Sequence, residues 1–468
     1  MKGAIAVAVA TAALASGAAT PAKLVARASS SAASSATGTS SGSVPTVTVK
    51  GNAFFAGEDR FYIRGVDYQP GGSSGASDPI SNVAGCTRDI VEFKKLGINT
   101  VRVYSVDNTA NHDECMSALA AAGIYLALDV NTPKYSINRG DPGPSYNADY
   151  LQSIFATIDA FAHYDNTLLF FSGNEVINDD NTTNCAPYVK AVGRDMKQYI
   201  GSRGYRSIPV GYSAADVESN RFDMAQYMNC GTDDQRSDFF AFNDYSWCNP
   251  SSYTQSGWDA KVAMYGNYSI PLFLSEYGCI KGQRTFDEVA ALYGTDMTPV
   301  YSGGLVYEYS EEGNDYGIVK ISGTTVSEEA AFTALAQQLS KNVPSGDGGY
   351  KSTGTPSTCP SQSDTWEVTD FTGEELPAIP SGAVSFMKDG AGTGPGLAGS
   401  GSQNAGGAST STATPGSGSV TAVASGGAAA SASASSAAQA LIAGEMGVAP
   451  FVCGAVVLVS TLFGASLL

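Results

Sequence analysis

Between about residues 60 and 310, eight short β-rich runs alternate with amphipathic stretches, and this alternation limits the possible folds more than any other feature. Several of the runs, such as LLFFS at 168–172, are apolar without interruption. Continuous apolar strands are typical of a parallel sheet that helices cover. Eight such units in about 250 residues favour a closed (β/α)8 TIM barrel.

The expected strands are 61–68, 99–104, 125–129, 168–172, 208–212, 239–243, 272–275 and 304–309. Helices are expected at 87–96, 113–122, 149–164, 188–203, 258–265 and 286–293, where apolar residues recur at helical spacing. A doubly wound open sheet is the alternative architecture. It calls for a glycine-rich G-x-G-x-x-G loop after the first strand, and the sequence Gly65-Val66-Asp67 does not supply one.

The charge balance excludes several classes of function. The 468 residues include 26 Lys and Arg against 44 Asp and Glu, a net charge of −18. A nucleic-acid binder needs clustered basic residues to neutralise phosphates, and so does a protein that adheres to anionic lipid. The chain has only two histidines, which makes a histidine-rich metal site or a Ser-His-Asp triad improbable. We therefore expect carboxylate chemistry with no metal and no cofactor.

Both ends of the chain have the composition of processing signals. Residues 1–19 combine Lys2, an apolar stretch at 5–14 and small residues at 17–19, which predicts a secretory signal peptide rather than a buried core helix. The last apolar run, 448–468, is followed by no charge and preceded by small residues at 431–438. This pattern predicts a glycosylphosphatidylinositol (GPI) attachment propeptide at 438–468, with a tail-anchored membrane helix as the alternative.

The remaining boundaries follow from composition. Residues 20–44 form a low-complexity N-terminal segment, and residues 45–389 are predicted to be the barrel with a C-terminal extension. Between residues 390 and 447 there is no aromatic residue, and Glu445 is the only charge. Such a segment has little apolar surface to bury, so residues 390–437 are predicted to be a disordered Ser/Gly/Ala-rich stalk.

The cysteines and two sequons fit a secreted protein. Of the eight cysteines, Cys453 lies in the predicted propeptide, which leaves an odd number in the mature chain. None is in a C-x-x-C pair, and spacing alone does not determine how they pair. Asn181 and Asn267 are candidate N-glycosylation sites because each begins an N-x-[ST] sequon.

Two glutamates follow apolar strands directly. Glu175 comes after the fourth run and Glu276 after the seventh, at the strand ends where barrel enzymes place their functional residues. Two facing carboxyl groups suit glycoside cleavage, in which one donates a proton and the other attacks the anomeric carbon; retaining enzymes hold them about 5 Å apart. The alternative is that either glutamate only pairs with a barrel arginine such as Arg102.

Other strand ends carry aromatic, amide and acidic side chains that could contact a sugar. Sugars present apolar faces rimmed by hydroxyl groups, which flat aromatic rings with polar edges match, although tyrosine and tryptophan are also common packing residues. These candidates are Tyr68, Gln69, Tyr104, Asp129, Asn131, Asn243, Asp244, Tyr245, Trp247, Tyr307 and Tyr309.

Seven motifs occur in order along the chain: GVDYQPGG (65–72), LGINTVRVYSVD (96–107), LDVNTP (128–133), FFSGNEV (170–176), FNDYSWC (242–248), LSEYGC (274–279) and GLVYEYSEE (304–312). Together they resemble the fungal β-1,3-glucanosyltransferases of glycoside hydrolase family 72, over roughly residues 45–396. No cysteine lies between Cys359 and Cys453, so the chain resembles the subgroup without a C-terminal cysteine-rich carbohydrate-binding module.

The resemblance implies a retaining mechanism on β-1,3-glucan. Glu175 corresponds to the acid/base and Glu276 to the nucleophile. An internal bond of a donor glucan is cut, and the glycosyl-enzyme is passed to the non-reducing end of an acceptor glucan. Candidate substrate-binding residues are Gln69, Tyr104, Asp129, Asn174, Tyr245 and Tyr307, with Tyr68 and Asn131 beside them.

The resemblance also implies disulfides Cys86–Cys115, Cys230–Cys359 and Cys248–Cys279, with Cys185 unpaired. It places the protein on the extracellular face of the plasma membrane, held by a GPI anchor, and in the cell wall. Two other functions share these residues: an endo-β-1,3-glucanase that releases fragments to water, and a non-catalytic glucan-binding wall protein.

Overall fold

The computed structural model describes residues 44–407 and 410–423. The predicted signal peptide at 1–19, the low-complexity segment at 20–44 apart from its last residue, the stalk beyond residue 423 and the GPI propeptide at 438–468 lie outside these residues. In the part of the chain that is described, no helix is both long enough and apolar enough to cross a bilayer.

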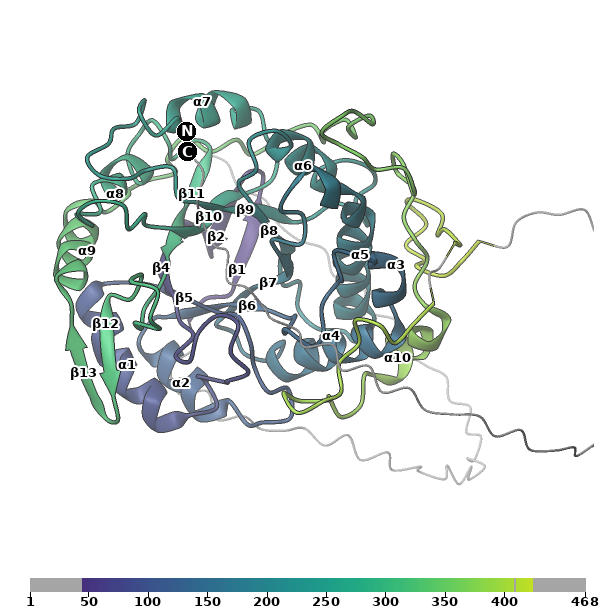
Figure 1. Ribbon diagram of the computed structural model, residues 1–468, viewed down its shortest axis with the longest axis horizontal. Coiled ribbons are helices and arrows are strands. Elements are labelled where there is room, and N and C mark those ends of the chain that lie inside the picture. The colour runs from purple at the N-terminus through teal and green to yellow at the C-terminus, as the bar shows by residue number, and fades with distance from the viewer. Residues whose placement is uncertain (1–43, 408–409, 424–468) are drawn as a thin grey trace, which may run out of the picture. The chain divides into compact units, whose positions relative to one another are not determined.

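Eight parallel strands close into a barrel, as Figure 1 shows. Each strand pairs with the one that follows it, and the last strand pairs with the first. The predicted (β/α)8 barrel is therefore confirmed. Its strands are β4 (Ile63–Asp67), β5 (Thr100–Val103), β6 (Tyr125–Asp129), β7 (Thr167–Asn174), β8 (Val210–Ala215), β9 (Phe239–Asp244), β10 (Leu272–Tyr277) and β11 (Tyr301–Val306).

Helices surround the barrel (Figure 1). Their ends follow local sequence signals: α1 begins where the side chain of Asn82 accepts a hydrogen bond from the Gly85 amide, and it ends at Gly97, which has a left-handed φ of 72°. The helices around the barrel are α1 (Val83–Leu96), α2 (Asp113–Ala121), α3 (Pro142–Ser145), α4 (Ala148–Phe161), α5 (Ala186–Ser202), α6 (Arg221–Met228), α7 (Trp258–Tyr265), α8 (Glu288–Leu292) and α9 (Ala330–Lys341).

Three of these helices, α3, α6 and α9, are absent from the sequence prediction. In α6 the apolar Phe222 is exposed on the side away from the buried Met224 and Met228, so apolar residues do not keep to one face and the helical pattern is weak. Helix α8 is shorter than the predicted 286–293, with five residues.

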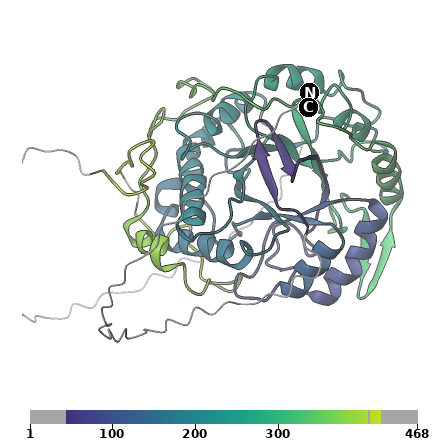
Figure 2. The same cartoon turned by 180° about the vertical axis from the view of Figure 1, so that it is seen from behind.

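A small antiparallel sheet lies across the N-terminal end of the barrel. It consists of β1 (Val47–Lys50), β2 (Ala53–Ala56) and β3 (Asp59–Phe61), and Figure 2 shows it in purple from behind. The ring of Phe54 lies 6.2 Å from that of Phe239 and 5.9 Å from that of Phe273, both inside the barrel. This sheet fills the end of the barrel opposite the candidate site.

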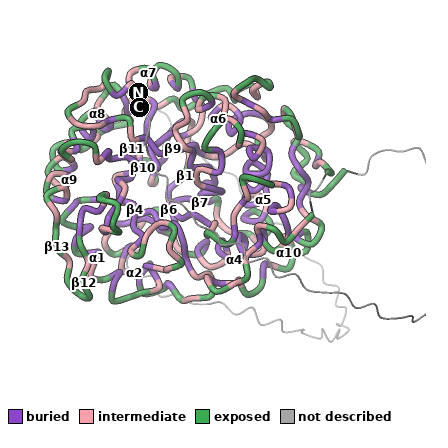
Figure 3. Tube along the Cα trace, in the orientation of Figure 1, coloured by how far each residue is buried: buried purple, intermediate pink, exposed green. Residues whose placement is uncertain are grey.

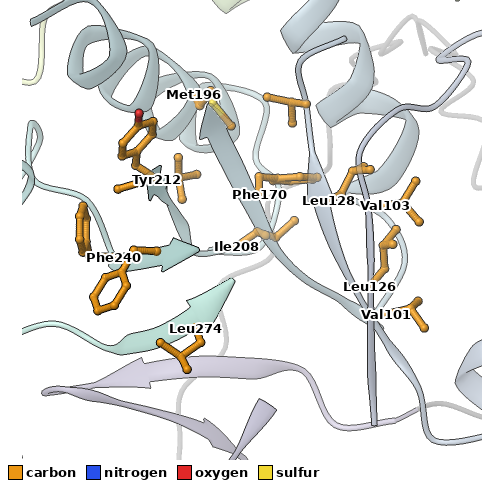
Figure 4. Close-up of a cluster of buried hydrophobic side chains, with 14 of the residues drawn as sticks. Val101, Val103, Leu126, Leu128, Phe170, Met196, Ile208, Tyr212, Phe240 and Leu274 are labelled. Carbon is orange, nitrogen blue, oxygen red and sulfur yellow. The ribbon is translucent and has the colours of Figure 1, made fainter. Parts of the chain in front are cut away.

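Alternating side chains divide the barrel strands between two cores. Val101 and Val103 on β5, and Leu126 and Leu128 on β6, point outward into the core beneath the helices, as Figure 4 shows. Ala127 belongs to the separate core inside the barrel. The residues between the outward ones therefore face the barrel interior, and nearly every strand residue is buried (Figure 3).

The chain continues past the barrel into a C-terminal extension. A hairpin of β12 (Val319–Ser322) and β13 (Thr325–Glu328) precedes α9, and the 3-10 helix η2 (Ser381–Ala383) leads into α10 (Val384–Asp389). Helix α10 packs against α5, and η2 packs against α4.

The predicted disorder from residue 390 is wrong for the described part of that segment. Residues 390–407 and 410–423, which we call the C-terminal strap, run along the molecule beside α4 and α5 (yellow-green in Figure 1). The side chain of Gln152 donates hydrogen bonds to the carbonyls of Ala391 (3.0 Å) and Thr393 (2.7 Å), and the Ile379 amide donates to Val420 (2.8 Å). Polar groups of the folded domain thus bind the strap's backbone, a stabilisation that its own composition does not reveal.

Three disulfides join cysteines of the described residues. Cys86–Cys115 joins α1 to α2, Cys230–Cys359 joins the end of α6 to the extension, and Cys248–Cys279 joins the loops after β9 and β10. They are the pairs that the family resemblance implies. Cys185 is free and buried, and burial raises the pKa of its thiol to about 11.

Candidate active site

A β-bulge in β10 directs Glu276 into the barrel. Strict alternation from the outward Leu274 would place Ser275 inside and Glu276 outside. The register against β9 shifts between Leu274 and Glu276, and Tyr277 returns to the outer core with Leu274. Ser275 and Glu276 therefore both face inward, as residues beside a bulge can.

Glu276 is 7% exposed and accepts three side-chain hydrogen bonds. The Tyr104 hydroxyl donates to Oε1 at 2.7 Å, and the Tyr245 hydroxyl donates to Oε2 at 2.7 Å. The guanidinium of Arg102 also donates to Oε1, at 3.4 Å. All three donors favour the ionised carboxylate.

Arg102 links four strands from inside the barrel. It lies between the outward Val101 and Val103 and is completely buried. Its guanidinium donates two hydrogen bonds to Asp129 at the end of β6 (2.8 and 3.1 Å) and one to Asn174 Oδ1 at the end of β7 (3.0 Å). A further nitrogen donates to the Ser275 carbonyl on β10 at 3.1 Å. Arg102 therefore sets the relative positions of the strand ends that carry the site.

Glu175 follows β7 in a backbone conformation that L-residues rarely adopt, with φ of 48°. Its amide donates to the Ser213 carbonyl at 2.9 Å, and its own carbonyl accepts from the Arg139 guanidinium at 2.6 Å. The carboxylate accepts one hydrogen bond, from Asn243 Nδ2 at 2.8 Å. These contacts hold a strained residue at the rim of the barrel, a feature that recurs at functional sites.

The orientation of Asn243 follows from its other contacts. Its Oδ1 accepts from the hydroxyls of Ser275 (2.9 Å) and Ser213 (3.2 Å). Its Nδ2 is therefore left to face Asn174 and Glu175.

Opposing influences act on the protonation of Glu276. Burial raises its pKa to about 7, and the negative charge of Glu175 raises it as well. Arg102 and the hydroxyls of Tyr245 and Tyr104 lower it. Arg102 contacts both Glu276 and Asn174, the residue before Glu175, so the two glutamates belong to one hydrogen-bonded network at the barrel mouth.

Tyrosine rings surround Glu276. Tyr307 makes edge-to-face contacts with Tyr104 and Tyr245, in each case with ring centroids 6.4 Å apart, and with Tyr316 at 5.2 Å. The Tyr307 hydroxyl is within 3.2 Å of the Ser73 Oγ. Aromatic faces with polar edges are thus arranged around one of the two carboxylates.

A cavity of about 500 Å³ adjoins this cluster. Four of the predicted substrate-binding residues line it: Tyr104, Asp129, Asn131 and Asn174. Tyr245 and Tyr307 do not line this cavity. Tyr245 belongs to the site through its hydrogen bond to Glu276, and Tyr307 through its ring contacts with Tyr104 and Tyr245.

Two predicted substrate-binding residues are not at the cleft surface. Tyr68 is 1% exposed, and its hydroxyl donates to Asp89 on α1 at 2.8 Å, outside the barrel. Gln69 is also 1% exposed; its Oε1 accepts from the amides of Tyr104 (3.0 Å) and Ser105 (3.2 Å). Both side chains are occupied by contacts within the protein, and Gln69 acts by holding the backbone of Tyr104.

Sequence reasoning missed other residues of the site. It considered Arg102 only as an alternative partner for a glutamate, and the structure shows that pairing with Glu276 together with the other contacts of the site. Arg139 and Tyr316 lie in loops with no distinguishing pattern. The two predicted glycosylation residues, Asn181 and Asn267, are both exposed.

The sequence profile of glycoside hydrolase family 72, described as glucanosyltransferase, matches residues 36–343. The chain belongs to this family. The 1,3-beta-glucanosyltransferase gel1 of Aspergillus fumigatus is 65% identical over 426 residues, which cover 91% of this chain and 93% of gel1. GAS5 of Saccharomyces cerevisiae, which has the same enzyme name, is 55% identical over 358 residues, or 75% of this chain and 73% of GAS5.

Solved structures of the family share the fold. A crystal structure of Saccharomyces cerevisiae Gas2 in complex with laminaritetraose and laminaripentaose superposes with a TM-score of 0.66 and 39% identity. It covers 72% of this chain, and the match spans 75% of the Gas2 chain. The Glucanosyltransferase profile ends at residue 343, well before the C-terminal strap.

Proposed function

We propose that this chain is a retaining β-1,3-glucanosyltransferase. It cuts an internal bond of a β-1,3-glucan and transfers the fragment to the non-reducing end of a second glucan, which is thereby elongated. Family membership and the enzyme names of gel1 and GAS5 support this activity. The observation that carries the assignment of roles is the unequal supply of donors: Glu276 accepts three side-chain hydrogen bonds and Glu175 accepts one.

In the first step Glu276, as the carboxylate, attacks the anomeric carbon and forms a glycosyl ester. Glu175 gives its proton to the glycosidic oxygen, and the fragment with the old reducing end departs. In the second step Glu175 takes the proton from the 3-hydroxyl of an acceptor glucan. The oxygen of that hydroxyl attacks the anomeric carbon and releases Glu276, so that the β configuration is retained.

The remaining residues bind and orient the glucan. Tyr104, Asp129, Asn131 and Asn174 contact sugar units in the adjoining cavity, where they form part of the lining. Tyr245 and Tyr307 provide aromatic surface beside the nucleophile. Arg102 is a positioning residue, because it contacts Glu276 and the side chain next to Glu175.

We also propose that the enzyme works outside the cell, at the plasma membrane. The signal pattern at 1–19 and the propeptide pattern at 438–468 support secretion followed by GPI anchoring at the outer face of the plasma membrane. The enzyme then acts on cell-wall glucan, in agreement with its fungal relatives gel1 and GAS5, which are named 1,3-beta-glucanosyltransferases. Residues 44–423 form the catalytic unit, and the predicted stalk is shortened to 424–437.

The test uses a β-1,3-glucan oligomer whose reducing end has been chemically reduced. After incubation with the purified protein, mass spectrometry measures the lengths of the products. We expect products both longer and shorter than the substrate. Products that are only shorter would identify a hydrolase, and no reaction at all would indicate a binding protein.

Three substitutions test the assigned roles. Glu175→Gln and Glu276→Gln are expected to abolish transfer and to leave the melting temperature close to that of the wild type. Glu288→Gln is the matched control, because Glu288 is another buried glutamate (3% exposed) that belongs to α8 rather than to the site. Normal transfer by either active-site variant would overturn the assignment.

A further inference from the structure

We propose that Gln403 of the C-terminal strap is a sugar-binding residue of the glucan cleft. This inference rests on the proposed function and extends it to a segment outside the family match, which ends at residue 343. The strap then completes a subsite wall in addition to packing against the barrel. Its ligand is a glucosyl unit of a β-1,3-glucan chain.

Gln403 lines the cavity that adjoins the catalytic residues. Tyr104, Asp129 and Asn174 line the same cavity of about 500 Å³. Two of these side chains lie next to the reaction centre, because the Tyr104 hydroxyl contacts Glu276 and Asn174 immediately precedes Glu175. The cavity therefore continues from the reaction centre to the strap.

The strap holds Gln403 in place. Gln403 Nε2 donates to the Ser136 Oγ at 2.7 Å. The preceding residue, Ser402, is 1% exposed; its amide donates to the Lys134 carbonyl at 3.0 Å, and its carbonyl accepts from Asn147 Nδ2 at 2.7 Å. The amide and the carbonyl of Ser402 are both hydrogen-bonded, so the backbone next to Gln403 is fixed. The Gln403 side chain is therefore already positioned before a ligand arrives, and binding costs little further conformational entropy.

The amide group of Gln403 suits a sugar hydroxyl. Gln403 uses Nε2 within the protein, and its Oε1 accepts no hydrogen bond from the described residues. This oxygen is therefore left as an acceptor in the cavity, and a sugar hydroxyl can donate to it. Asn131 offers no comparable donor, because its Oδ1 accepts from the Tyr150 hydroxyl at 2.5 Å and its Nδ2 is buried.

The place of the cavity predicts which substrates depend on Gln403. Glu175 and Glu276 are not part of its lining, so the sugar it holds is not the one whose bond is cut. A short oligomer that fills only the positions at the glutamates does not reach Gln403. A longer oligomer does, and its binding includes one more hydrogen bond.

Steady-state kinetics of Gln403→Ala with reduced β-1,3-oligomers of increasing length test the proposal. A lost hydrogen bond between neutral groups corresponds to a roughly three- to ten-fold change. We expect kcat/KM to fall by about that factor for long oligomers, through a higher KM with kcat nearly unchanged, and short oligomers to react as with the wild type.

Two further variants separate binding from a structural role. Gln403→Glu keeps an acceptor oxygen at this position, and we expect it to retain most of the long-oligomer kcat/KM. Asn404→Ala alters the exposed neighbour, which does not line the cavity, and we expect no change. An equal loss for all lengths with a lower melting temperature, or no loss for any length, would overturn the proposal.

The outcomes also separate this proposal from the proposed function. If the wild type transfers glucan and Gln403→Ala behaves identically, only the sugar-binding role of Gln403 fails. If the wild type produces only shorter products, the transferase proposal fails. The length dependence of Gln403→Ala then still decides the role of Gln403 in the hydrolytic reaction.

Discussion

The Tyr245→Phe variant isolates one of the donors that keep Glu276 ionised. The Tyr245 hydroxyl lies 2.7 Å from Glu276 Oε2, and among the described residues it is the only donor to that oxygen. Phenylalanine keeps the ring and its contacts with Tyr307 and Tyr316, so that the fold should be preserved. The substitution removes one charge-assisted hydrogen bond and little else.

The magnitude follows from the strength of that bond. A hydrogen bond to a charged group contributes about 1.5–3 kcal/mol, and 1.36 kcal/mol corresponds to a tenfold change in a protonation equilibrium. Loss of the donor destabilises the ionised form of Glu276, so its pKa rises. Because Glu276, as the proposed nucleophile, must be ionised, the acidic limb of kcat/KM against pH should move upward by about one to two pH units.

The assay is kcat/KM for transfer between reduced oligomers, measured from about pH 5 to pH 10, because this parameter reports the ionisation of the free enzyme. Tyr316→Phe is the control: it removes a hydroxyl from the same aromatic cluster, and Tyr316 makes no hydrogen bond to Glu276. An acidic limb that stays in place for Tyr245→Phe, with an unchanged melting temperature, would refute the reasoning.

Three further outcomes follow from groups elsewhere in the molecule. Iodoacetamide at pH 8 should leave Cys185 of the native protein unmodified and should label it once in denaturant, because the thiol is buried and burial raises its pKa to about 11. Mass spectrometry measures the labelling, and a labelled native protein would contradict this expectation. Burial raises the pKa values of Glu276 and Glu288 to about 7, above the ordinary 4.5, so the folded state retains protons that the unfolded chain loses. The melting temperature should therefore fall as the pH rises from about 5 to 7, and a rising value in calorimetry would refute this. Replacing Cys230 and Cys359 together by alanine should lower the free energy of unfolding by about 2–4 kcal/mol, because their bond closes a loop with a sequence separation of 129; a denaturant titration measures it, and no change would be inconsistent with a stabilising bond.

The sequence indicated the barrel because its strands are covered on both faces. A run such as 168–172 is apolar throughout, since Phe170 packs beneath the helices and Phe171 packs inside the barrel. The same reasoning placed Glu175 and Glu276 at strand ends, where a carboxylate after an apolar run stands out.

What the sequence did not show depends on contacts between distant residues. The bulge that turns Glu276 inward is a property of the register between β9 and β10, and no local pattern marks it. Tyr68 and Gln69 are polar-edged residues at a strand end, and only the partners Asp89 and Tyr104 show that their polar groups are already occupied. The order of the strap likewise comes from side chains hundreds of residues earlier in the chain.

If the enzyme is held by the proposed GPI anchor at its C-terminal side, the Cys230–Cys359 bond has a mechanical consequence. Tension applied beyond Val423 would load the strap first, and its hydrogen bonds would release one after another, taking Gln403 out of the cleft. The peeling would stop at Cys359, where the covalent bond passes the load to Cys230 beside α6. The strap, with Gln403, would therefore lose its contacts before β7 and Glu175 were disturbed.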